Sequence, residues 1–250
     1  MFEMFPMMSD RPEGKTVVGG GLYWLLFVIG LPFGMSFIWW TGNALPILLL
    51  YAVSFLAVGV VFFRYLRDSF FNVRCYPGRF WATVGISGGT VLTLETTLLF
   101  ICLASYDSNA ILASHNILPM AEVPLLLGVS PAFMEMPLLM LLCSTVFVPL
   151  TMCCLYYGVG FAPAAEERPW LGYLIVAVLA AVPRLFGLGN TGYPLYQLIV
   201  YFLQLPWHLC ACWAYQKADT IWAPICMYVL VNLVSGVSTV LYIFLTRGVF

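Results

Sequence analysis

The sequence predicts an all-α, polytopic transmembrane helix bundle of about seven to eight spans. Of its 250 residues, 62% are hydrophobic and 8% are charged, whereas about a quarter of residues are charged in soluble globular domains. Apolar runs long enough to cross a bilayer, about 20 residues each, fill nearly the whole chain. We therefore expect a short cytoplasmic N-terminus at residues 1–16 and a single membrane domain at 17–250.

Seven apolar runs are candidate spans, and one further segment is ambiguous. The seven runs are residues 17–40, 45–65, 80–104, 137–160, 170–188, 195–215 and 221–245. Residues 110–134 contain Pro119, Pro124 and Pro131, so this segment is either an eighth span or a re-entrant or interfacial helix, which is tolerated only when packed within protein. Two groups of glycines indicate close helix packing, namely Gly19, Gly20 and Gly21, and Gly85, Gly88 and Gly89.

The distribution of basic residues predicts the orientation. Arg11 and Lys15 precede the first run, and four arginines lie between the second and third, namely Arg64, Arg67, Arg74 and Arg79. Cytoplasmic loops carry an excess of Lys and Arg, so the N-terminus and the arginine cluster are expected in the cytoplasm. The arginines are best interpreted as contacts to lipid phosphates. A net charge of −1 and the lack of a nucleic-acid-type basic patch argue against a nucleic-acid partner, and membrane lipid is the expected one.

No cofactor or metal is expected. The eight cysteines include no CxxC pair, and the chain has two histidines, too few for a typical zinc cluster. The cysteines are interpreted as small hydrophobic residues.

The adjacent acids Glu166 and Glu167 are the first candidate site residues. Two neighbouring carboxylates in a low dielectric cannot both ionise freely, so one is suited to act as a general base. The structural alternative is that both acids face water at the start of the helix beginning near Pro169, where negative charge is favoured.

Further polar residues lie inside the apolar runs. Tyr228 and Asn232 are four residues apart and therefore share a helix face, either as site residues or as a clamp between helices. Glu95 is expected to face the bundle interior, as part of the same cavity or as an interhelical contact with nearby threonines. His208 is either a substitute for a catalytic histidine or a packed side chain, and His115 is expected in a surface loop.

The last third of the chain resembles the CAAX prenyl protease type II and bacteriocin-processing (Abi, CPBP) family of intramembrane glutamate proteases. The family motifs are EExxxR followed by a Gly-Tyr/Leu-Leu string, then FxxxH, then HxxxN on the last helix. The matching residues are Glu166-Glu167, Trp170, Gly172-Tyr173-Leu174, Phe186, Trp222-Ala223-Pro224-Ile225 and Asn232.

The resemblance implies an Abi/CAAX-protease-like core at about 137–245 and a bacterial plasma membrane as the location. It also implies that Glu166, Glu167, Asn190, Tyr228 and Asn232 converge on one cavity open to the cytoplasm. Three motif positions depart from the family: Leu171 replaces the arginine, and Asn190 and Tyr228 replace the histidines.

These departures lead us to expect a catalytically degenerate pseudoprotease that serves as a membrane scaffold or regulator of a membrane protein. The alternative is an active intramembrane endopeptidase in which Glu166 or Glu167 activates water against a peptide substrate. A transporter-like role is a third possibility, although paired broken helices are not evident in the sequence.

Overall fold

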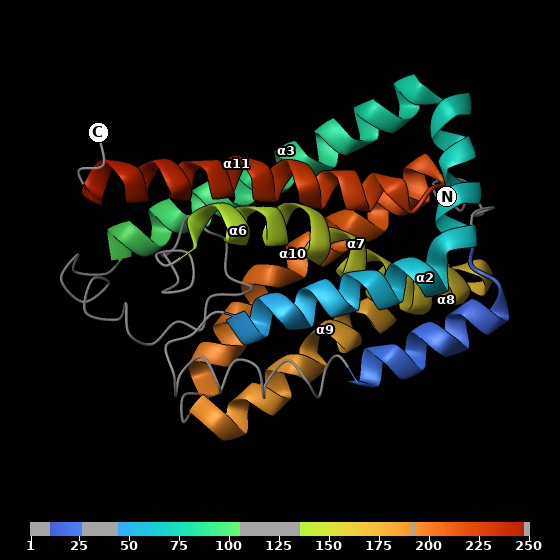
Figure 1. Ribbon diagram of the computed structural model, residues 1–250, viewed down its shortest axis with the longest axis horizontal. Coiled ribbons are helices and arrows are strands. Elements are labelled where there is room, and N and C mark those ends of the chain that lie inside the picture. Colours follow the sequence, from blue (N-terminus) through green and yellow to red (C-terminus); the bar gives the residue numbers. More distant parts are fainter. Residues whose placement is uncertain (1–10, 27–44, 106–135, 192–193, 248–250) are drawn as a thin grey trace.

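The computed structural model describes residues 11–26, 45–105, 136–191 and 194–247, and these residues form helices with no strand among them (Figure 1). A helix at residues 14–26 comes first. The others are α2 (Leu45–Cys75), α3 (Pro77–Ser105), α6 (Pro137–Leu142), η3 (Cys143–Phe147), α7 (Val148–Met152), η4 (Cys153–Phe161), α8 (Ala162–Glu167), α9 (Pro169–Thr191), α10 (Pro194–Ala218) and α11 (Trp222–Arg247). The all-helical prediction is confirmed for this part of the chain.

The predicted apolar runs from residue 45 onward coincide with helices. Among the described residues, two helices are long and apolar enough to cross a membrane, Leu48–Cys75 and Pro137–Glu166. Shorter apolar helices lie at Pro169–Val182 and Trp222–Val237. The ambiguous segment at 110–134, with His115, lies outside the described residues, as do residues 27–44 of the first predicted run.

Residues 137–167 form one helical rod whose hydrogen bonding changes along its length. It contains two π-helical stretches, η3 and η4. A proline inside a helix lacks the N–H and collides with the carbonyl four residues earlier. The carbonyl four residues before Pro149 lies in η3, and the carbonyl four residues before Pro163 lies in η4. The clash at each proline therefore explains why the backbone hydrogen bonds of these two stretches shift to the wider i→i+5 pattern.

Helix α10 is central because it packs against α3, α9 and α11. Helix α11 also packs against η3, and α9 packs against η4. The buried core therefore lies between α10, α11 and the 137–167 rod, with fully buried side chains from each, among them Tyr157, Tyr215 and Met227.

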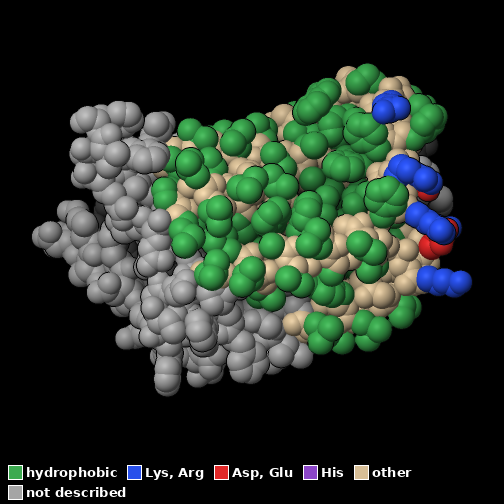
Figure 2. Space-filling model, viewed as in Figure 1, with side chains coloured by type: hydrophobic (Ala, Val, Ile, Leu, Met, Phe, Trp, Pro, Cys, Tyr) green, Lys and Arg blue, Asp and Glu red, His purple; other side chains and the backbone are tan. Residues whose placement is uncertain are grey.

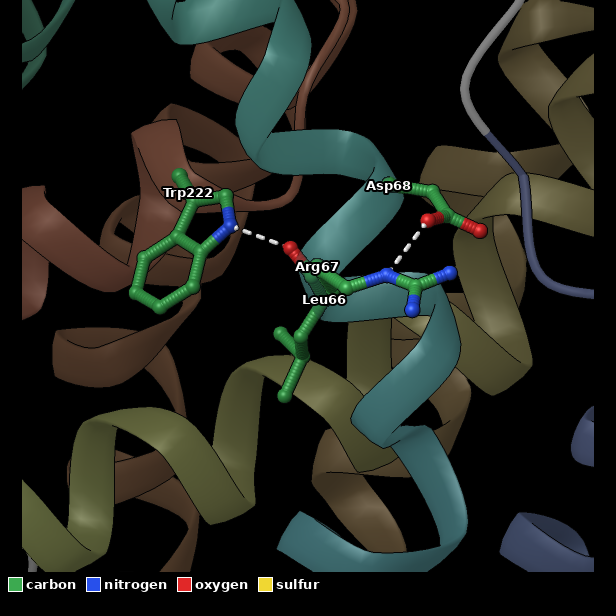
Figure 3. Close-up of polar contacts among 4 residues, drawn as sticks. All are labelled: Leu66, Arg67, Asp68 and Trp222. Carbon is green, nitrogen blue, oxygen red and sulfur yellow. Dashed lines mark hydrogen bonds and ion pairs between the residues drawn. The ribbon is translucent and has the colours of Figure 1, made fainter.

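Helix α2 changes direction along its length, and its C-terminal part, which ends at Cys75, crosses the end of the bundle (Figure 1). We call residues 64–75 the lateral segment. The Trp222 indole N–H donates to the Leu66 carbonyl at 2.8 Å (Figure 3). The Ser69 and Thr220 hydroxyls lie 2.8 Å apart. These hydrogen bonds join the lateral segment to the turn between α10 and α11. In that turn, Asp219 adopts a left-handed φ of 53°.

Exposed apolar side chains form a stripe along the first half of α2. Its members recur at helical spacing, namely Leu49, Val53, Leu56, Val60 and Phe63. A second stripe lies on α9 at Trp170, Leu174 and Val178. Hydrophobic side chains cover most of the described surface in Figure 2, while the Lys and Arg side chains visible there gather at one end. Soluble monomers rarely expose apolar patches this extensive.

The two glycine groups pack differently. A Cβ on Gly20 would lie 2.6 Å from Val159 Cγ2 and 2.8 Å from Phe62 Cζ. Gly20 therefore lets the helix at 14–26 approach η4 and α2 closely. A Cβ on Gly88 would lie 3.0 Å from Leu230, whereas no described atom lies within 4 Å of one on Gly85 or Gly89. Among the described residues, the close-packing prediction is thus confirmed for Gly20 and Gly88, while a Cβ on Gly19 or Gly21 would make only ordinary contacts and one on Gly85 or Gly89 would make none.

We predict different effects of alanine at two adjacent glycines. Gly20→Ala should destabilise the protein by about 1–3 kcal/mol, the usual cost of overpacking. At Gly19 a Cβ meets only Val61, at an ordinary 3.7 Å, so Gly19→Ala should be neutral or stabilising by up to about 1 kcal/mol, the gain in helix propensity. Thermal unfolding of both variants in detergent measures this difference, and equal Tm values would contradict the close approach at Gly20.

Candidate functional site

A cluster of hydrogen-bonded aromatic side chains lies in the buried core. The Tyr157 hydroxyl, on η4, lies 3.0 Å from Nδ1 of His208 on α10. The same hydroxyl lies 2.8 Å from the hydroxyl of Tyr228 on α11. One phenol therefore connects three helices that are far apart in the sequence. We call Tyr157, His208 and Tyr228 the phenol–imidazole cluster.

The cluster is enclosed by further aromatic rings. The ring centroids of Trp207 and Tyr228 lie 5.2 Å apart, and those of Tyr156 and His208 lie 5.3 Å apart. Tyr157 is fully buried, and Tyr228 and His208 are each 7% exposed. Burial of a polar group is costly unless it is hydrogen-bonded, and the two contacts at Tyr157 provide that compensation.

The cluster can carry a directed chain of hydrogen bonds. A hydroxyl both donates and accepts, and a neutral imidazole has one donor and one acceptor nitrogen. Tyr228 can therefore donate to Tyr157 while Tyr157 donates to His208, or each bond can run the other way. Within the described part of the chain, neither phenol is hydrogen-bonded to a carboxylate.

Glu166 lies apart from this cluster. Its carboxylate pairs with the Arg11 guanidinium, and both side chains are 52% exposed. Glu166 is nine residues beyond Tyr157 on the same rod, which at 1.5 Å per residue places it about 13 Å along the axis. The structure therefore matches the alternative in which this acid faces water. The backbone of Glu167 ends α8, and its side chain lies outside the described residues.

Asn232 contacts the 137–167 rod at a different place from the cluster, thirteen residues before Tyr157. Its amide donates to the backbone carbonyl of Ser144, on η3, at 2.7 Å. It shares α11 with Tyr228 but makes the helix–helix clamp that was one of the two predicted interpretations. The expected convergence with Glu166 is therefore not observed: Glu166 contacts Arg11, Tyr228 contacts Tyr157, and Asn232 contacts Ser144.

Two other predicted residues are only partly described. Asn190 is in the last turns of α9, and Glu95 is in α3, but both side chains lie outside the described residues. The threonines around Glu95 donate to carbonyls of their own helix: Thr93 to Gly89, Thr96 to Leu92 and Thr97 to Thr93. Each of these hydroxyls therefore already donates its hydrogen bond within α3 and does not need the Glu95 carboxylate as an acceptor.

The central residue, Tyr157, was missed in the sequence because a tyrosine in an apolar run is usually part of the core. His208 was singled out, and the structure places it beside Tyr228 as a buried, hydrogen-bonded histidine. The sequence offers one signal for Tyr157. His208 and Tyr228 lie in apolar runs, and each needs a hydrogen-bond partner when it is buried, so another polar side chain in an apolar run is expected beside them.

Comparison of the chain with protein-family models, with curated proteins and with solved structures gives no match.

We predict that the contributions of Asn232 and Glu166 to stability differ in their dependence on salt. Asn232→Ala removes an interhelical hydrogen bond and should cost about 0.6 kcal/mol, and at most about 1.7 kcal/mol. Glu166→Gln breaks only an exposed ion pair, which contributes about 0–1 kcal/mol and should vanish in high salt. Unfolding curves at low and high salt separate the two effects. A salt-insensitive loss for Glu166→Gln larger than that for Asn232→Ala would contradict this assignment.

Proposed function

We propose that the chain is an integral membrane protein of the CPBP/Abi type that has lost the protease chemistry and serves as a membrane scaffold or regulator. In this proposal it spans the bacterial plasma membrane about seven to eight times, with the N-terminus in the cytoplasm and the protease-like core at about 137–245. Its partners are membrane lipid and a membrane protein.

Membrane integration is supported by the surface of the helices. The exposed stripes on α2 and α9 consist of large apolar side chains, and two described helices have the length and hydropathy of spans. Lipid covers such stripes without cost. The described Lys and Arg side chains visible in Figure 2 lie at one end, as expected for residues that contact water and headgroups.

The loss of catalysis is supported by one observation, the environment of Tyr228. The resemblance assigns this position to a motif histidine that works with a glutamate. Here it is a buried phenol that contacts the phenol of Tyr157. A general base must lie within hydrogen-bond reach of the water that it activates, about 2.6–3.2 Å. Glu166 is about 13 Å along the rod from Tyr157 and is paired with Arg11.

The scaffold role is favoured because the phenol–imidazole cluster is buried and connects three helices through the Tyr157 hydroxyl, which supports a fixed arrangement of those helices. The described core is closely packed around it, with Cys153, Cys154 and Leu155 fully buried beside Tyr157. A fixed bundle with apolar outer faces is suited to binding a partner helix in the membrane, where van der Waals packing drives association.

We predict that removing both acids leaves proteolysis in the membrane unchanged. Protein termini are compared in membranes that carry the wild-type chain or Glu166→Gln/Glu167→Gln at equal expression. The scaffold proposal expects identical termini, and it expects the same membrane protein to co-purify with both chains in mild detergent.

The matched control is Arg11→Gln, which breaks the same ion pair without touching either acid. Termini that occur only with the wild type and with Arg11→Gln would show that an acid catalyses hydrolysis, and the active endopeptidase would then replace the scaffold.

A further inference from the structure

The lateral segment presents arginines on one face. At 100° per residue, Arg64, Arg67 and Arg74 fall within about 80° of each other around the helix axis, and all three are exposed. Tyr65, Leu66 and Ser69 lie on the opposite face and are buried. The segment is therefore amphipathic across the end of the bundle, with its charged face directed outward.

Exposed aromatic side chains accompany the arginines. Phe71 is 67% exposed, Tyr76 is 64% exposed and Trp81 is 61% exposed. The Arg74 guanidinium lies 5.2 Å from the centre of the Phe70 ring. Aromatic residues and arginines together are typical of the headgroup level of a bilayer. We call residues 64–81 the basic corner.

The length of α2 places the basic corner at that level. About 20 residues cross the hydrocarbon core, so a span that starts at Leu45, where α2 begins, reaches the polar boundary near Arg64, where the lateral segment starts. The remaining residues of α2 turn across the end of the bundle (Figure 1), where the basic side chains gather (Figure 2). The bend keeps the arginines in one layer, at the boundary and not progressively farther into water.

Hydrogen bonds hold the basic corner in place. The Asn72 amide donates to the Asp219 carbonyl at 2.8 Å, and Arg79 Nε donates to the Lys217 carbonyl at 2.6 Å. Trp222 bonds the Leu66 carbonyl, next to the exposed pair Arg67–Asp68 (Figure 3). The exposed Lys217 side chain adds a further positive charge beside Arg79. These hydrogen bonds hold the backbone that carries the arginines of the basic corner in one position.

We propose that the basic corner binds anionic phospholipids of one leaflet, with Arg64, Arg67 and Arg74 on lipid phosphates and the exposed aromatic rings at the glycerol level. The proposal rests on the membrane integration proposed above but not on the scaffold role. Charge complementarity selects this occupant, because basic residues next to a span attract anionic lipid, roughly fivefold in association per residue. The bound lipid would fix both the depth of the bundle and the position of the α10–α11 turn.

The test is a titration of the purified full-length chain in neutral detergent with phosphatidylglycerol, phosphatidylcholine or inorganic phosphate. Lipid binding is measured by native mass spectrometry, and Tm is measured at each point. We expect phosphatidylglycerol alone to bind tightly and to raise Tm. Arg64→Gln/Arg67→Gln/Arg74→Gln should lower its affinity on the order of a hundredfold. Each single variant should lower it roughly fivefold, which keeps the test valid if the triple variant is unstable.

The matched control is Arg11→Gln/Lys15→Gln/Arg168→Gln, which removes the same charge outside the basic corner and should keep most of the affinity. Equal losses in both triple variants, or equal binding of phosphatidylcholine, would overturn the proposal, and so would a Tm shift with inorganic phosphate alone. A triple variant that keeps its lipid affinity but loses a co-purifying protein would assign the corner to a protein partner instead. Alkaline extraction of membranes is a separate arm: release of the wild-type chain would overturn the proposed membrane integration, whatever the lipid result.

Discussion

The hydroxyl of Tyr157 is the contact on which the arrangement of the core helices depends. In an apolar bundle, backbone polar groups are satisfied within each helix, so side-chain polar contacts distinguish one packing of apolar surfaces from another. Tyr157 joins η4 to α10 through His208 and to α11 through Tyr228. A second contact between the Tyr65 and Tyr215 hydroxyls joins α2 to α10. Polar side chains thus specify which helices are neighbours, while apolar packing supplies most of the contact area.

This constraint has a consequence for chemistry. A glutamate protease needs an ionised carboxylate in a dry site, together with groups that stabilise negative charge as it develops. The described core instead places phenols and an imidazole in contact. The described acid Glu166 lies at the exposed end with Arg11. The described polar contacts in this part of the core are therefore between neutral groups, and they join helices.

The helices could be predicted from the sequence, because apolar runs and their polar boundaries are local signals. The direction of the lateral segment could not, since the contacts that hold it are distant: Trp222 and Thr220 bond it across about 150 residues of chain. The site was predictable only in part. Tyr228 and His208 stand out as polar residues in apolar runs, but the sequence gives no indication that Tyr157 connects them. The pair Glu166-Glu167 stands out in the sequence because charge is rare in this chain. The Glu166 side chain is nevertheless exposed, where an ionised carboxylate costs little.

The central claim is that Tyr157 and Tyr228 stabilise the fold through each other, and a double-mutant cycle tests it most directly. The free energy of unfolding is measured in detergent for the wild type, Tyr157→Phe, Tyr228→Phe and the double variant. A direct hydrogen bond predicts a coupling energy of about 0.5 kcal/mol or more, with the double variant less damaged than the sum of the single variants. Additive losses, with a coupling energy near zero, would show that the two phenols do not depend on each other and would contradict the account.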